Sequence, residues 1–279
     1  MHVGRLRQEY TVEFADEMMR ACGKQAEELT VEPESLLAEM DRAGVERAVL
    51  LAFNARRTLG VHVTNELVGK WCSQVPQRFL GLASYDGRDS LRKRELVLDR
   101  KRYRLSGYKL AYGYLAMAPD EPDWWPLYED ALEHDLPVLV HMGFSPIKRV
   151  SLRHCHPGLL EPVLSRYPSL KLVIAHMGWP WISETIELMA RYPNTYADLS
   201  IVSRYQPIEQ VVEIFSKAAA AGVEGKLLFG TDYPMCGFAE GLARIKELRQ
   251  RVRVSTGGIS EGVWDKILYG NAKHLLNLP

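Results

Sequence analysis

The sequence has little cysteine, no long apolar run and no excess of charge of either sign. Cys22, Cys72, Cys155 and Cys236 lie far apart and form no C-x-x-C pair, so neither a zinc knuckle nor a disulfide framework is indicated. No apolar run approaches the roughly 18 residues of a membrane span, and the first residues are charged where an export signal would be apolar. We therefore expect a protein of the reducing cytoplasm.

Charge also excludes some partners. The 35 basic residues are matched by 35 acidic ones, so no net field would recruit nucleic acid or an anionic membrane. A basic run from Arg88 to Arg104 is interrupted by Asp89, Glu95 and Asp99, and this pattern predicts a solvated helix face. We expect a small-molecule partner, no nucleic acid or membrane partner, and a homodimer as the assembly.

Length and periodicity together predict the fold class, α/β with a (β/α)₈ TIM barrel. The chain has 279 residues, 47% of them hydrophobic, and roughly 250 residues make one such barrel, so residues 1–279 are predicted to form a single domain. Short apolar runs rich in β-branched residues alternate with helical stretches. The expected strands are Arg47–Phe53, Phe79–Tyr85, Gly107–Tyr112, Pro137–Gly143, Lys171–Gly178, Thr195–Ser200 and Lys226–Thr231.

Helical stretches between these runs carry single apolar stripes, as in Ile208, Val211, Val212, Phe215 and Ala219. Gly44 and Gly222 follow such stretches at positions suited to helix C-caps. The seven expected strands imply an eighth, which should be the first. Met1 to Gly4 resemble the end of that strand, so a truncated first strand is expected.

Polar side chains close several strands. His141, His176 and Asp232 each follow an apolar run directly, and in a parallel barrel the carboxyl ends of the strands meet at one mouth. A lone histidine beside an apolar run is more often a core residue, but a set at the same end of several strands favours a site. Imidazole and carboxylate suit a divalent cation, with Zn²⁺ as the first expectation and Mn²⁺ or Mg²⁺ as alternatives. His2 would complete the ligand set.

Several stretches in chain order resemble one known family. They are V-L-V-H-M-G at 138–143, Y-P-S-L-K-L-V-I-A-H-M-G at 167–178, N-T-Y-A-D-L-S at 194–200 and L-L-F-G-T-D-Y-P at 227–234. The chain is similar to the amidohydrolase-related metal-dependent hydrolases, a branch that also contains the aminocarboxymuconate-semialdehyde and γ-resorcylate decarboxylases. The resemblance implies an enzyme, with His141 and Asp232 as metal ligands and His176 as the catalytic imidazole.

The family pattern opens with an H-x-H pair that supplies two further ligands. His2 matches the second histidine, and the first would fall one position before Met1. Two interpretations stay open: the start has been placed too late, or a ligand has been lost. With a metal held by His2, His141 and Asp232, we expect Asp232 to accept a proton from an attacking water while His176 polarises a carbonyl.

Further side chains near the strand ends are candidates for substrate binding. We expect an aromatic wall and a group of polar contacts for an acidic or polar substituent. The candidates are Phe144, Trp179 and Tyr233 for the wall, and Arg5, Asn54 and Lys109 for the polar contacts.

Three functional hypotheses follow. The first is a metal-dependent hydrolase of a small amide, ester or lactone that is cyclic or bears a carboxylate. The alternative is a non-oxidative decarboxylase of an aromatic or muconate-type acid, and the second alternative is a metal-free binding barrel that lacks a ligand. These rest on the resemblance, because one fold supports many chemistries.

Overall fold

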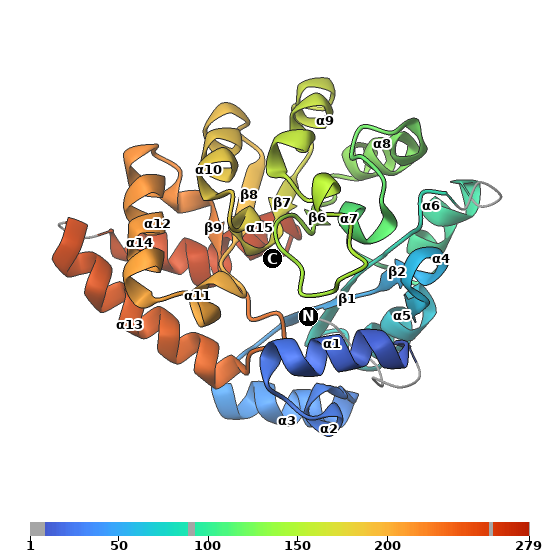
Figure 1. Cartoon of the computed structure of the whole chain (residues 1–279), viewed down its shortest axis with the longest axis horizontal. Helices are drawn as coiled ribbons and strands as arrows, with labels where there is room; N and C mark the ends of the chain where they lie inside the picture. Colours follow the sequence, from blue (N-terminus) through green and yellow to red (C-terminus); the bar gives the residue numbers. More distant parts are fainter. Residues whose placement is uncertain (1–8, 89–92, 257–258, 279) are drawn as a thin grey trace.

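The computed structural model describes residues 9–88, 93–256 and 259–278. Its strands are short and alternate with helices (Figure 1). The strands are β1 (Ala48–Leu51), β2 (Phe53–Ala55), β3 (Val61–Val63), β4 (Phe79–Leu82), β5 (Tyr108–Leu110), β6 (Val138–Val140), β7 (Leu172–Ile174), β8 (Thr195–Asp198) and β9 (Leu227–Leu228).

The α-helices surround these strands. They are α1 (Val12–Cys22), α2 (Ala26–Leu29), α3 (Pro33–Ala43), α4 (Arg56–Leu59), α5 (Asn65–Gln74), α6 (Lys93–Arg102), α7 (Tyr112–Leu115), α8 (Trp125–Glu133), α9 (Glu161–Arg166), α10 (Ile182–Arg191), α11 (Val202–Tyr205), α12 (Ile208–Ala220), α13 (Phe238–Thr256), α14 (Glu261–Asp265) and α15 (Asn271–Leu275). Short 3-10 turns, including η5 (Ala175–Gly178), and the π-helix η7 (Lys266–Gly270) complete the order.

The parallel strands follow one another in chain order. β1 pairs with β4, and β5 to β9 form a five-stranded sheet in sequence order. An isolated parallel bridge between Ala83 and Tyr108 connects the end of β4 to β5. Each strand expected from the sequence is present, although shorter than its apolar run. The expected first strand and the predicted end of it at Met1 to Gly4 lie outside the described residues.

Two features of the helices confirm the periodicity argument. Ile208, Val211 and Phe215 of α12 are buried, as predicted. Val212 and Ala219 are only half-buried, and Ile214 and Ala218 are buried in their place. The prediction is therefore wrong for Val212 and Ala219, because the buried face of α12 is rotated slightly from the predicted stripe although both repeat about every 3.6 residues. Gly44 and Gly222 adopt left-handed backbone at φ 69°, as predicted for C-caps.

One residue of the basic run from Arg88 to Arg104 is buried and not solvated. Arg100 on α6 is buried, and its Nε lies 2.7 Å from Oδ2 of Asp130 on α8. The phenol of Tyr108 donates to the same carboxylate. The prediction of a solvated helix face is therefore wrong for Arg100, because a carboxylate from another helix neutralises it, and it holds for the exposed Lys101 and Arg102.

Segment α1–α2 packs against the loop that follows β9. Ala15 and Leu29 form a small apolar cluster with Met235, and Nζ of Lys24 donates to the backbone oxygen of Pro234 at 2.6 Å. In Figure 1 these helices lie beside α3 at the lower edge of the molecule. The N-terminal helices thus lie over the loop that carries Asp232.

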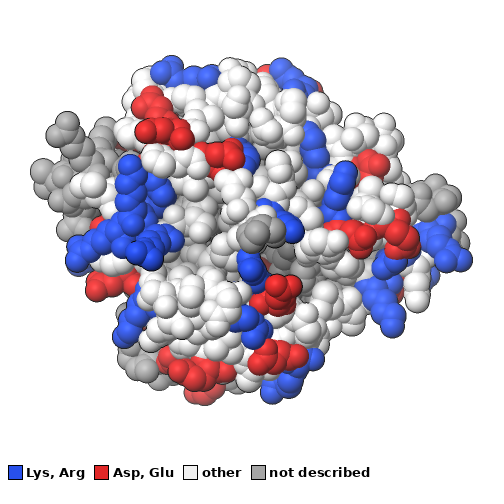
Figure 2. All heavy atoms as spheres, turned by 180° about the vertical axis from the view of Figure 1, so that it is seen from behind, with Lys and Arg blue, Asp and Glu red and all other residues white. Residues whose placement is uncertain are grey.

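The surface carries both signs of charge. Figure 2 shows Lys and Arg side chains interspersed with Asp and Glu over the face that it presents. Among the described residues, every helix is too short or too polar to cross a membrane.

Candidate active site

The carboxyl ends of the parallel strands open into one cavity of about 310 Å³. His141 directly follows β6, His176 lies in η5 after β7, and Asp232 follows β9. Lys109 is the central residue of β5. All four side chains line the cavity. The structure therefore brings together the groups that the strand ends predicted.

The two histidines are in ring contact. The ring centroids of His141 and His176 lie 5.0 Å apart in an edge-on arrangement, and Tyr114 on α7 presents its ring to His141 at the same distance. Both imidazoles are buried. The backbone N–H of His141 donates to the oxygen of Leu110 at 2.8 Å, which continues the β5–β6 ladder to the site and fixes His141 relative to β5.

Backbone conformation at the strand ends is unusual. His176 has φ 57°, the following Met177 has φ 53°, and Asp232 has φ 50°. Left-handed backbone is uncommon for residues other than glycine and is concentrated at functional sites. Here it turns the chain sharply at the end of two strands, at two of the predicted site residues.

Two polar residues at the end of β8, Asp198 and Ser200, support His176. Nδ1 of His176 lies 2.8 Å from Oγ of Ser200, and Ser200 donates to Oδ1 of Asp198. The same carboxylate oxygen accepts from the backbone N–H of His176 at 3.1 Å and of Ser200 at 2.9 Å. No role was assigned to Asp198 or Ser200 from the sequence, although both lie in the N-T-Y-A-D-L-S stretch, directly at a strand end.

Lys109 is the buried cation of the site, with 3% of its surface exposed. Burial lowers the pKa of its ammonium group to about 8, because desolvation penalises the charged form, and the nearby carboxylates of Asp232 and Asp198 oppose that shift. A buried cation beside the site is the group expected to receive an anionic substituent.

Aromatic and apolar side chains form the rest of the cavity wall. Phe144 and Trp179 meet edge to face with ring centroids 5.8 Å apart, and both line the cavity. Phe14 and Met18 of α1 also line it, although nothing was predicted for them. Their spacing on an amphipathic helix is also that of ordinary core packing, so the sequence pattern carries no signal of this role.

Two predicted substrate-binding residues lie elsewhere. Asn54 on β2 is absent from the cavity lining, because its side-chain oxygen accepts from the backbone N–H of Arg56 within its own turn. Tyr233 is also absent from the lining, and its ring stacks on Phe238 at 5.0 Å. His2 and Arg5 lie outside the described residues.

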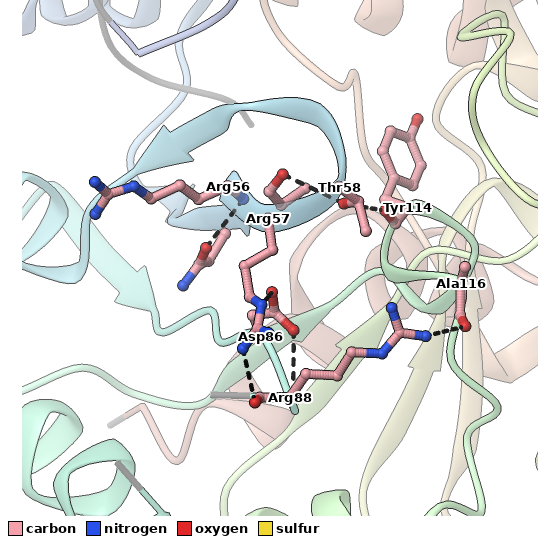
Figure 3. A network of polar contacts seen from close by, with 9 residues as sticks. Arg56, Arg57, Thr58, Asp86, Arg88, Tyr114 and Ala116 are labelled. Carbon is pink, nitrogen blue, oxygen red and sulfur yellow. Dashed lines mark hydrogen bonds and ion pairs between the residues drawn. The ribbon is translucent and has the colours of Figure 1, made fainter. Parts of the chain in front are cut away.

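The backbone around Tyr114 is held by a polar network (Figure 3). Oγ1 of Thr58 donates to the backbone oxygen of Tyr114 at 2.7 Å, and the guanidinium of Arg88 donates to the oxygen of Ala116 at 2.7 Å. Asp86 accepts from the backbone N–H of Arg88 and lies 4.0 Å from Nε of Arg57. These contacts hold the C-terminal end of α7, which carries the Tyr114 ring that faces His141.

The donors suit a divalent metal in kind. Imidazole and carboxylate groups suit Zn²⁺ or Mn²⁺, and His141, His176 and Asp232 border one cavity. Within residues 9–88, 93–256 and 259–278, however, no three or more His, Cys, Asp or Glu side chains are grouped closely enough to hold a metal ion. A complete set of protein ligands would need a residue from outside this part of the chain.

Comparisons with known proteins agree with this architecture. A solved TIM-barrel protein from Bordetella bronchiseptica, described as uncharacterized, is 26% identical, with 93% of this chain and 88% of that chain covered and a TM-score of 0.77. A dihydroxybenzoic acid decarboxylase from Polaromonas sp. JS666, solved with bound manganese and the inhibitor 2-nitroresorcinol, is 18% identical over 99% of this chain and 95% of that chain, with a TM-score of 0.65.

Two further similarities were found. A probable 2-pyrone-4,6-dicarboxylic acid hydrolase from Acinetobacter baumannii, solved with citric acid, is 17% identical over 88% of this chain and 89% of that chain, with a TM-score of 0.66. Protein fluG of Emericella nidulans is 26% identical over 96 residues. That match spans 34% of this chain and only 11% of fluG.

The family model described as amidohydrolase matches residues 13–278. The match covers nearly the whole chain and confirms the fold class, the family resemblance and the prediction of an enzyme. The chain belongs to the amidohydrolase family.

Proposed function

We propose that this enzyme hydrolyses a small amide, ester or lactone whose ring or short chain carries a carboxylate. The observation that supports the proposal best is the position of Lys109, a buried cation in a cavity that is otherwise mainly aromatic and aliphatic. An apolar wall with a few convergent polar groups is the usual form of a small-molecule site. The cavity of about 310 Å³ fits a compact substrate.

Lys109 would bind the substrate carboxylate. A charged group in such surroundings requires a partner of opposite sign, and a substrate carboxylate would join Asp232 and Asp198 in stabilising the ammonium. Phe144 and Trp179 would pack against the apolar part of the substrate, since their rings line the same cavity. The substrate would then lie with its reacting carbonyl near the histidines.

His176 and Asp232 would handle the protons of the reaction. Both line the cavity, and each follows a different strand, so they can approach a carbonyl group from two directions. A carboxylate and an imidazole are suitable acid–base groups for removing a proton from water and returning it to a leaving group. The enclosed apolar wall would strengthen their electrostatic interactions with the reacting atoms.

A divalent metal is part of this proposal, with His2, His141 and Asp232 as its protein ligands. When bound, such a metal acts as a Lewis acid and lowers the pKa of water. Zn²⁺ suits the donors, and Mn²⁺ is the ion bound by the structurally similar decarboxylase from Polaromonas. The metal requirement can be measured independently of the substrate.

A second candidate is a non-oxidative decarboxylase. The specific observation in its favour is the apolar character of the wall around Lys109. Apolar surroundings destabilise the charged carboxylate relative to neutral CO₂ and so favour its loss. Lys109 would hold the carboxylate until the carbon–carbon bond breaks, and His176 would deliver a proton to carbon. The fold is shared with hydrolases and decarboxylases alike, so product analysis must decide.

The test is a product assay on protein stripped with a chelator and reloaded with Zn²⁺ or Mn²⁺. Lactones, esters and amides of carboxylated rings are assayed for ring opening or acid release, and hydroxybenzoates for released CO₂. The proposal expects metal-dependent hydrolysis. Release of CO₂ without hydrolysis would establish the second candidate, and binding of the acids without turnover under either metal would favour a metal-free binding barrel.

A further inference from the structure

We infer that Asp198, acting through Ser200, holds His176 in the tautomer that carries its proton on Nδ1, so that Nε2 accepts a proton from the attacking water. The inference rests on the proposed hydrolytic function and assigns positioning roles to two residues. It also determines that His176 begins the reaction as a proton acceptor and not as a proton donor.

The contacts form a chain from one carboxylate to the imidazole. Oδ1 of Asp198 accepts from the hydroxyl of Ser200 and from two backbone N–H groups. Oγ of Ser200 in turn lies 2.8 Å from Nδ1 of His176. Ser200 is 4% exposed and His176 is 8% exposed, so water competes little for these hydrogen bonds.

Counting donors fixes the direction of the chain. An ionised carboxylate only accepts hydrogen bonds, and a serine hydroxyl has a single proton to donate. Because Ser200 gives that proton to Asp198, its oxygen must act as the acceptor towards His176. Nδ1 of His176 is therefore the protonated nitrogen, since the hydrogen bond at one ring nitrogen sets the state of the other.

In the neutral ring, Nε2 then carries a lone pair. During attack, the water oxygen forms a bond to the carbonyl carbon, the carbonyl π pair moves to its oxygen, and the water proton passes to Nε2. The resulting imidazolium returns that proton to the leaving oxygen or nitrogen as the bond to it breaks. The ring is neutral again at the end, so no other reactant is consumed.

This assignment differs from the expectation that His176 begins by polarising a carbonyl. A neutral imidazole that donates through Nε2 would need its proton there and not on Nδ1. Ser200 and Asp198 oppose that arrangement.

Nitrogen NMR of histidine-labelled protein reads the tautomer directly. In the wild-type enzyme at alkaline pH we expect His176, assigned by the loss of its signals in His176→Asn, to show a protonated Nδ1 and an unprotonated Nε2. In Ser200→Ala we expect a shift towards the tautomer with Nε2 protonated. Ser203→Ala is the matched control, because Ser203 is equally buried, and within the described part of the chain the side chains that hydrogen-bond His176 are those of Asp198 and Ser200.

Kinetics provide the second readout. Loss of a group that orients a reacting imidazole typically costs about 10- to 100-fold, so Ser200→Ala should lower kcat by that factor and leave KM nearly unchanged, whereas Ser203→Ala should change neither. A purely structural role for Ser200 would lower the melting temperature and the fraction of active protein without moving the tautomer.

The inference is overturned if wild-type His176 carries its proton on Nε2, or if Ser200→Ala leaves the tautomer unchanged. The wild-type spectrum decides the matter even where Ser200→Ala does not fold. Failure of the proposed function is distinguishable: the tautomer would be as described, but no ester, amide or lactone would be hydrolysed.

Discussion

The imidazole of His141 lies against the imidazole of His176, with ring centroids 5.0 Å apart, although the two residues follow different strands. The neighbouring positions of β6 and β7 in the sheet produce this contact. Since Asp232 and Lys109 border the same cavity, two imidazoles, a carboxylate and an ammonium group line one cavity at the mouth of the barrel.

Lys109→Met should weaken binding of carboxylate substrates selectively. Methionine keeps much of the lysine volume but loses the charge, and a hydrogen bond to a charged group is worth about 1.5–3 kcal/mol. We therefore expect KM for a carboxylate substrate to rise by about tenfold or more, with little change for its neutral methyl ester. Lys101→Met, at an exposed position of α6, serves as the control. Equal effects on acid and ester would refute the role of Lys109.

Gly143→Ala should disturb the aromatic wall through the backbone. Gly143 has φ 95°, and an added Cβ would lie 2.4 Å from the backbone oxygen of Trp179. Because a backbone clash and a left-handed conformation both oppose alanine, we expect destabilisation of about 2 kcal/mol or more in urea unfolding. Gly225→Ala is the matched control, since, its chain neighbours aside, no atom of the described residues lies within 4 Å of its added Cβ. Similar unfolding midpoints for the two variants would contradict the tight contact.

Thiol labelling should discriminate among the cysteines. Burial raises the pKa of Cys155 to about 11 and those of Cys72 and Cys236 to about 12. The thiolate is the reactive form, and its fraction falls about tenfold for each unit by which the pKa exceeds the pH. At pH 8, iodoacetamide should therefore modify the half-buried Cys22 well before the others.

Labelling of the three buried thiols should accelerate as the pH rises towards these pKa values, and unfolding in urea should remove the difference from Cys22. Mass spectrometry of peptides from the native protein measures each rate. Rapid modification of Cys155 at pH 8 would show that its surroundings are less protected than the structure indicates.

Asp130→Ala should destabilise the barrel strongly, because it leaves Arg100 buried without its carboxylate partner. Breaking a buried pair in this way costs about 3–5 kcal/mol. Asp41→Ala removes an exposed partner of Arg78 and should cost about 1 kcal/mol or less. Chemical unfolding of both variants measures the contrast, and a small loss for Asp130→Ala would mean that water reaches Arg100.

Much of the fold follows from local patterns. The parallel strands and most of the buried face of α12 could be predicted because apolar periodicity is visible in the sequence. The glycine caps could be predicted from the position of glycine after each helical stretch. His141, His176 and Asp232 could be predicted because a residue directly after a barrel strand must lie at the mouth.

Other features depend on contacts between distant segments. Arg100 looked like a solvated residue because its partner Asp130 lies on another helix. Phe14 and Met18 contribute to the cavity only because α1 folds over the loop after β9. The side-chain oxygen of Asn54 accepts a hydrogen bond within its own turn. The position of a polar residue near a strand end does not reveal such a local bond.

The most direct test of the central claim is steady-state turnover in His141→Ala and Asp232→Ala, each compared with the wild-type enzyme on the first substrate identified. With both groups at one reaction centre, each variant should lose activity by about 10²–10⁴-fold while circular dichroism and the melting temperature show a folded barrel. Asp120→Ala, at an exposed position, should retain full activity. Wild-type turnover in either His141→Ala or Asp232→Ala would contradict the assignment of the site.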